Sequence, residues 1–182
     1  MKSWVVLGLG LLGGGFIQGC SDQLSDIQGK MSGVWVLEER QFPDGSLFHP
    51  SKISGTLSWV PIDSRRAHVT LSMIIDKIGS SRRFNYAAST YEISTSAITR
   101  KRYLLIRQGY RSSAVSPLTV YSKPKTVKGK ISEREDGHIE ISHLIEDGTI
   151  GGPQKKRTWV FVGDTMVSSF PDVYKDTWKK VK

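Results

Sequence analysis

Alternation of apolar and polar residues is the feature that most constrains this chain of 182 residues. In the segment AHVTLSMI, Ala67, Val69, Leu71 and Met73 fall on one face of an extended strand, and His68, Thr70 and Ser72 fall on the other. A period of two residues is typical of a β-strand with one buried face. We therefore predict a strand here with the apolar set facing the core.

Similar short runs follow from Gly33 onward, separated by residues that favour tight turns, such as Pro43-Asp44-Gly45 and Asp136-Gly137. Further strands are expected at residues 34–42, 54–60, 84–93, 98–107, 118–122, 126–133, 138–145 and 157–162. Strands of this kind must pair into a sandwich or close into a barrel. Closure removes exposed edges. The prediction is an all-β, antiparallel up-and-down barrel of eight or nine strands.

The last residues, 171–182, have a different spacing. Val173, Trp178 and Val181 recur at loosely helical intervals, and Asp172 behind Pro171 is an acceptable helix cap. We expect a short C-terminal helix.

The N-terminal residues 1–19 read as a signal peptide. Lys2 is followed by an apolar and glycine-rich run from Trp4 to Ile17, and no acidic residue occurs before Asp22. A spanning helix needs about 20 apolar residues, so a transmembrane anchor is not expected. Residues 20–32 are expected to be a polar tether with one short helical turn over residues 25–30, and residues 33–182 the barrel domain.

The segment Ile17-Gln18-Gly19-Cys20 resembles the lipobox of bacterial lipoproteins. The resemblance implies cleavage before Cys20 and acylation of that residue with diacylglycerol and a fatty acid such as palmitate. Ser21, in place of an Asp, favours the outer membrane, with the domain facing the periplasm. The alternative is a free, buried cysteine after an ordinary signal peptide. The chain has one cysteine, which excludes an internal disulfide and a cysteine-rich zinc site.

The segment from Met31 to Trp59 resembles the opening of lipocalin-like domains. The matching positions are Gly33, Trp35, Leu37, Asp44-Gly45, Pro50 and Gly55-Thr56-Leu57. The resemblance implies a barrel floor made by Gly33 and Trp35, with Arg157 stacked on Trp35. The chain lacks a counterpart of the Thr-Asp-Tyr segment of the family. The alternative is that Trp35 is a core residue of some other β fold.

A small barrel holds either a packed core or one small ligand. We expect a hydrophobic or amphipathic ligand, such as a fatty acid or lysolipid. The residues expected to line its site inside the barrel are Trp59, Leu71, Met73, Phe84, Tyr86, Tyr103, Ile141 and His143.

His143 is the polar member of this set, because it shares a face with Ile139 and Ile141. A buried histidine needs a hydrogen-bond partner or loses its charge. His143 could orient a ligand carboxylate or bind haem, as a histidine does in some distant barrel relatives, or it could be an ordinary core histidine. No metal spacing occurs among the four histidines, and we expect no cofactor.

No catalytic motif occurs in the sequence, so an enzyme is not expected. The chain carries a formal charge of +9, which suggests anionic lipid or an acidic envelope protein as a partner, or a solvated surface. Nucleic acid is not expected for a periplasmic protein. The basic groups that could form one wall are Arg100-Lys101-Arg102, then Lys123, Lys125, Lys128 and Lys130, and finally Lys155-Lys156-Arg157.

Overall fold

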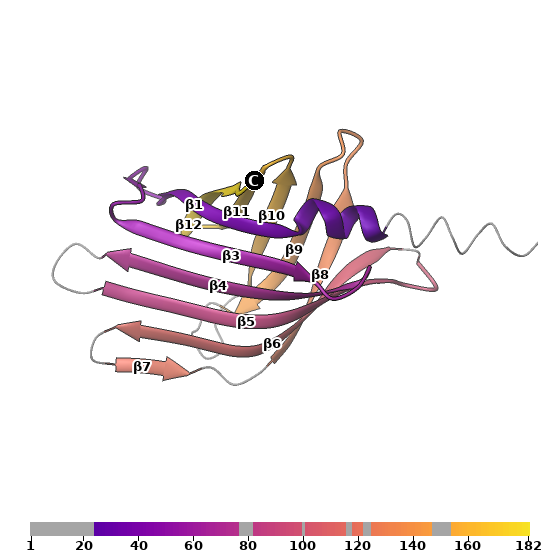
Figure 1. Cartoon of the computed structure of the whole chain (residues 1–182), viewed down its shortest axis with the longest axis horizontal. Helices are drawn as coiled ribbons and strands as arrows, with labels where there is room; N and C mark the ends of the chain where they lie inside the picture. The colour runs from indigo at the N-terminus through magenta and orange to yellow at the C-terminus, as the bar shows by residue number, and fades with distance from the viewer. Residues whose placement is uncertain (1–23, 77–81, 100, 116–117, 122–124, 147–153) are drawn as a thin grey trace, which may run out of the picture.

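The computed structural model of the chain describes residues 24–76, 82–99, 101–115, 118–121, 125–146 and 154–182. These residues form one antiparallel sheet of twelve strands (Figure 1). The strands are β1 (Gly33–Gln41), β2 (Leu47–Phe48), β3 (Ile53–Pro61), β4 (Arg66–Asp76), β5 (Arg82–Thr95), β6 (Arg102–Val115), β7 (Leu118–Tyr121), β8 (Lys125–Glu133), β9 (Ile139–Glu146), β10 (Gln154–Val162), β11 (Thr165–Phe170) and β12 (Tyr174–Lys180).

The sheet closes on itself. Its order is β1-β3-β4-β5-β6-β8-β9-β10-β11-β12, and β12 pairs back onto β1, which makes a ring of ten strands. The short strands β2 and β7 lie outside the ring and pair with β1 and β6. The predicted all-β, antiparallel up-and-down barrel is confirmed. The predicted count of eight or nine strands is too low, because β2, β11 and β12 were not expected.

Strand β4 follows the alternation that predicted it. Ala67, Val69 and Met73 are buried on the inward face, and His68 and Ser72 are exposed on the outer face. β4 pairs with β5 over its whole length and with β3 over residues 67–75. The period of two residues therefore fixed which face of this strand meets the core.

The predicted C-terminal helix is wrong, because this segment forms β12. Asp176 and Trp178 are buried and alternate with the exposed Lys175 and Lys179, which is the pattern of a strand rather than a helix. Asp172 lies in the turn before β12 with a φ of 57°, so it does not cap a helix. Pairing of β12 with both β1 and β11 closes the barrel.

A helix over residues 24–31 covers one end of the barrel (Figure 1). Leu24, Ile27 and Met31 share one helical face and are buried in the core. The Gln28 side-chain amide donates to the carbonyl oxygen of Arg66 over 2.8 Å, which ties the helix to the start of β4. The short helical turn expected here is confirmed. Residues 24–31 belong to the folded domain rather than to the expected tether over residues 20–32.

The interior at this helix end is aromatic and tightly packed. The ring centroids of Trp35 and Phe161 lie 5.6 Å apart, and those of Trp59 and Tyr91 lie 4.7 Å apart, both edge-on. Tyr91 also stacks on Trp159 at 5.9 Å. Such pairs stabilise a core beyond their buried area.

No helix in the described ranges is both long and apolar enough to cross a bilayer.

Candidate ligand site inside the barrel

Solvent reaches the half of the interior that lies away from the helix. Leu71 and Ile75 are on the inward face of β4 together with Met73, yet they are only partly buried. Ala87 lies opposite Leu71 on β5, and Ser89 lies opposite Val69. These small side chains fill less of the interior than the indole and phenyl rings at the helix end. Large rings thus fill the barrel at the helix end, and smaller or partly buried side chains line it toward the other end.

Arg157 enters this half from β10. Its guanidinium carbon lies 5.2 Å from the ring centre of Trp159 and 5.9 Å from that of Tyr174. Its Nη2 atom donates to the hydroxyl oxygen of Ser168 over 3.4 Å, a long contact. Its Nε atom is buried and has no hydrogen-bond partner among the described residues. A buried donor of this kind is costly unless a partner reaches it.

Arg40 and Asp176 form a buried ion pair in the same half. A register shift in β1 between Leu37 and Glu39 turns the Arg40 side chain inward. Its Nε and Nη2 atoms donate to the two carboxylate oxygens of Asp176 over 2.6 and 2.7 Å. The guanidinium also lies 4.0 Å from the ring centre of Tyr174. Arg40 and Arg157 therefore place two positive charges here against the one negative charge of Asp176.

Burial raises the pKa values of two groups in the interior, and the nearby positive charges oppose both rises. Burial raises the pKa of the Asp176 carboxyl, although its hydrogen bonds to Arg40 and the charges of Arg40 and Arg157 oppose the rise. Burial also raises the pKa of Tyr91 to about 12, and the charge of Arg157 again opposes the rise. The positive charge of Arg157 therefore acts to lower the pKa of both Asp176 and Tyr91.

His143 lies directly opposite Arg157 in the pairing of β9 with β10. It is 7% exposed, and its ring lies edge-on to Trp159 with centroids 5.0 Å apart. Gly129 on β8 pairs with it from the other side. Across the part of the chain with described positions, no three His, Cys, Asp or Glu side chains are grouped to hold a metal.

Five of the eight residues expected inside the barrel are on its inward face. They are Trp59, Leu71, Met73, Ile141 and His143. Tyr86 is not among them: it pairs with Ser72 on the outer face and is 41% exposed. Tyr103 also faces outward, with the Lys128 ammonium 4.0 Å from its ring centre. Phe84 pairs with Ile74 along the backbone, and its side chain is outside the described part.

The phase error in β5 has a simple geometric cause. Tyr86 and Tyr91 are five positions apart in the sequence, so a regular strand can turn only one of them inward. Tyr91 packs between Trp59 and Trp159, which leaves Tyr86 outside. On β6 the inward residues are Leu104 and Ile106, which leaves Tyr103 on the outer face.

Gly33 and Trp35 lie at the helix end, as expected of a barrel floor, but Arg157 does not stack on Trp35. Lys180 pairs with Trp35 across β1 and β12, and its ammonium lies 5.4 Å from the indole centre. The indole N–H donates to the carbonyl oxygen of Met31 over 2.9 Å. Gly33 has a φ of 124°, and a Cβ atom there would lie 2.6 Å from Cε of Lys180. A side chain at position 33 would therefore be strained.

The sequence prediction missed Arg40, Ser168, Tyr174 and Asp176 in the interior. Arg40 was missed because a register shift in β1 turns it inward, and no residue type in the strand indicates that shift. The other three lie on β11 and β12, where no strand was expected. The signal for β12 was the alternation of Tyr174, Asp176 and Trp178, in which a charged residue occupies a core position.

Several predicted features fall outside the described residues. These include Cys20 with the segment before it, and the basic residues Arg100 and Lys123. Of the other basic residues, Lys128 and Lys130 are exposed on the outer face of β8.

Comparison with known proteins gives no match: no protein-family model, no curated protein and no solved structure is significantly similar to the chain.

Proposed function

We propose that the barrel binds one small amphipathic molecule with an anionic group, of the fatty acid or lysolipid type, on a lipoprotein held at the outer membrane through acylated Cys20. The fold would then be an outlying relative of the lipocalin-like barrels. Membrane lipids are abundant where such an anchor would place the domain. The barrel would act as a binding protein rather than an enzyme.

The buried Nε atom of Arg157, which has no hydrogen-bond partner in the described part, carries this proposal. A carboxylate or phosphate oxygen is the partner that a guanidinium favours most. The rings of Trp159 and Tyr174 hold the guanidinium in place. The partly buried Leu71 and Ile75 offer apolar surface to a hydrocarbon chain.

Competition between a fatty acid and the alcohol of equal length tests this assignment. The chain with Cys20→Ala, stripped of lipid, is titrated with a fluorescent fatty acid, and each competitor is added in turn. We expect the acid to bind about tenfold or more tighter than the alcohol, since a hydrogen bond to a charged group contributes about 1.5–3 kcal/mol. Arg157→Gln should remove this difference.

Lys156→Gln is the matched control, because Lys156 neighbours Arg157 on β10 but is exposed on the outer face. Thermal melts of each variant establish that the barrel is folded. Equal affinity for acid and alcohol in the unaltered barrel, or no saturable binding, would contradict the proposal.

A second candidate function is supported by the outer face of β8. Lys128 and Lys130 are exposed there, and Arg107 is exposed on the neighbouring β6. Such a face suits an acidic envelope protein or an anionic lipid, and its binding should weaken with salt. Crosslinking in cell envelopes tests it: the partner should be lost on the double change Lys128→Glu and Lys130→Glu, and retained on Arg157→Gln.

A further inference from the structure

We infer that the helix end of the barrel rests on the bilayer, and that two of its turns contact anionic lipid headgroups. These are the β3–β4 turn, residues 62–65, and the β5–β6 turn at residues 96–99. The inference builds on the proposed acyl anchor at Cys20. It is separate from the ligand site, which lies in the other half of the barrel.

Chain length limits how far the anchor can be from this end. The helix is described from residue 24, four residues after Cys20. An extended residue spans at most about 3.6 Å, so an acylated Cys20 would hold the helix within about 14 Å of the lipid. The β5–β6 turn projects at the same end of the barrel as the start of the helix (Figure 1).

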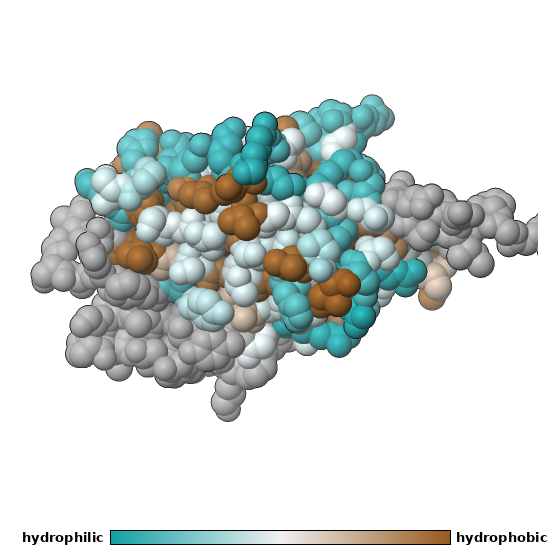
Figure 2. Space-filling model, in the orientation of Figure 1, coloured by the Kyte–Doolittle hydropathy of each residue, from teal (hydrophilic) through white to brown (hydrophobic). Residues whose placement is uncertain are grey.

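The two turns carry exposed isoleucines. Ile98 in the β5–β6 turn is 93% exposed, the most exposed of the large hydrophobic residues described, and Ile62 in the β3–β4 turn is also exposed. A small brown and tan tip lies below the grey atoms on the right of Figure 2, where the β5–β6 turn projects in Figure 1. The backbone N–H of Ile93 donates to the carbonyl oxygen of Arg65 over 2.7 Å, which holds the β3–β4 turn beside the end of β5. Burial of an isoleucine contributes about 1.5–3 kcal/mol.

Basic side chains flank these isoleucines. Arg65 is exposed in the β3–β4 turn, where the acidic Asp63 is paired with Arg66 at 2.7 Å, and Lys101 is exposed just after the β5–β6 turn. Each such cation near an anionic surface contributes about 1 kcal/mol. Hydrophobic insertion together with cationic contact is the combination that holds peripheral proteins on lipid.

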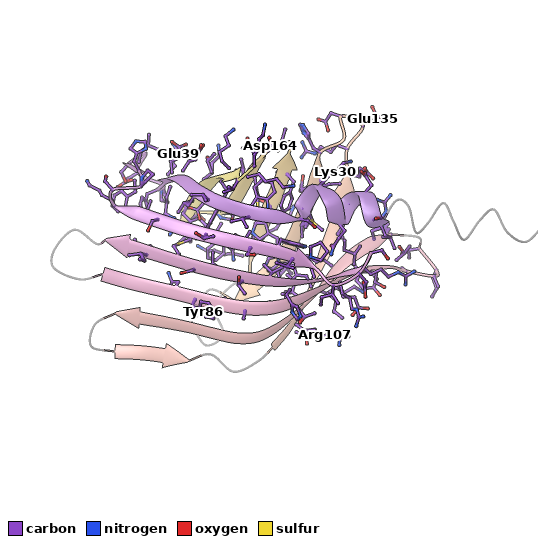
Figure 3. The ribbon with its side chains drawn as sticks, viewed as in Figure 1. Lys30, Glu39, Tyr86, Arg107, Glu135 and Asp164 are labelled. Atoms are coloured by element: carbon purple, nitrogen blue, oxygen red, sulfur yellow. The ribbon has the colours of Figure 1, made fainter. Side chains whose placement is uncertain are left out.

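The opposite side of the same barrel end is acidic. Glu135 and Asp136 are exposed in the β8–β9 turn, and the neighbouring Arg134 is paired with Glu140 at 2.6 Å. Glu135 lies well away from the β5–β6 turn in Figure 3, at the top of the view. An anionic bilayer would repel this turn, so the barrel should lean toward the β3–β4 and β5–β6 turns.

Depth-dependent fluorescence on the full, acylated chain tests the contact. A fluorophore sensitive to polarity is attached at Ile98→Cys, and the protein is reconstituted into vesicles of phosphatidylcholine and phosphatidylglycerol. Leu47→Cys is the matched control, because Leu47 is also an exposed apolar residue, 47% exposed, but follows β1 at the other end of the barrel. We expect a blue-shifted emission at position 98, quenched by lipid-borne quenchers, and neither effect at position 47.

Equal water exposure at both positions, or shielding at position 47 alone, would overturn the inference. The intact mass reports acylation separately. If the chain proves not to be acylated, the anchor proposal fails, and the contact is tested by cosedimentation of the same chain with these vesicles. Ile98→Asp must then weaken binding, and Arg65→Glu must weaken it by at least about fivefold, the equivalent of the 1 kcal/mol for each cation. Unchanged binding would reject the contact.

Discussion

Arg40 and Asp176, 136 residues apart, are directly paired where β1 meets β12 and are joined by two hydrogen bonds of 2.6 and 2.7 Å. Asp176 is fully buried and Arg40 nearly so. The ion pair spans the seam at which the last strand of the chain closes the barrel onto the first. The same ion pair therefore joins the two strands that close the barrel and lies in the half of the interior away from the helix.

Removal of either partner should destabilise the barrel strongly. Arg40→Ala leaves the Asp176 carboxylate buried without its counter-ion, and we expect a loss of about 3–5 kcal/mol in the free energy of unfolding. Urea denaturation measures it. Arg134→Ala is the control, since Arg134 pairs with Glu140 at an exposed position and should cost about 0–1 kcal/mol. Equal small losses would show that the seam does not depend on the pair.

Burial of Tyr91 should make the folded barrel less stable at high pH. Its pKa is about 12 in the folded barrel, against the ordinary value of 10.0. Below pH 10 the phenol is neutral in both states. Between pH 10 and 12 the unfolded chain loses its proton first, so the free energy of unfolding falls, by about 3 kcal/mol in all.

Urea unfolding at a series of pH values measures this fall. Tyr91→Phe should remove its part of the fall. Tyr86→Phe, at an exposed tyrosine on the same strand, should leave it in place. Identical pH dependence in both variants would argue against the buried phenol as the cause.

The helix over residues 24–31 should behave as part of the core. Ile27 is fully buried against the end of the barrel, so Ile27→Ala should cost about 2–5 kcal/mol. Ser25→Ala, on the exposed side of the same helix, should stay within about 0.5 kcal/mol. Thermal or urea unfolding distinguishes the two, and a negligible effect at Ile27 would mean that the helix is dispensable.

Acylation of Cys20 predicts incorporation of radioactive palmitate into the full chain in bacteria. Cys20→Ala should abolish the label and release the protein from the membrane fraction. Ser21→Ala, beside it, should keep both. Labelling that persists in Cys20→Ala would refute the lipoprotein assignment.

The barrel could be predicted because most of its strands obey a simple alternation. In β4 the inward positions are Ala67, Val69, Leu71 and Met73, as their alternation predicted, although the apolar Ile74 lies at an outward position. The neighbouring strands were recognised in the same way. The last strands of the chain, β11 and β12, could not be predicted in this way. Asp176 occupies an inward position between Tyr174 and Trp178, and only its partner Arg40, far away in sequence, makes a charge acceptable there.

The candidate site was predictable in its apolar part and at His143, but not in its charged residues. Met73, Ile141 and His143 follow the phase of strands with one clear buried face. Arg157 was predicted to stack on Trp35, which is wrong. The residue that contacts Trp35 depends on the register of β12, and that register places Lys180 there. Register between strands distant in sequence is set by tertiary packing and leaves little trace in either strand alone.

The position of a brominated fatty acid in crystals of the lipid-free chain tests the central claim most directly. Anomalous scattering from bromine locates the end of the hydrocarbon chain, and the density shows the carboxylate. The account predicts bromine inside the barrel on the side of Leu71 and Ile75, with a carboxylate oxygen within hydrogen-bond distance of Arg157. A fatty acid bound only outside the barrel, or an interior that stays without ligand at saturating concentration, would contradict it.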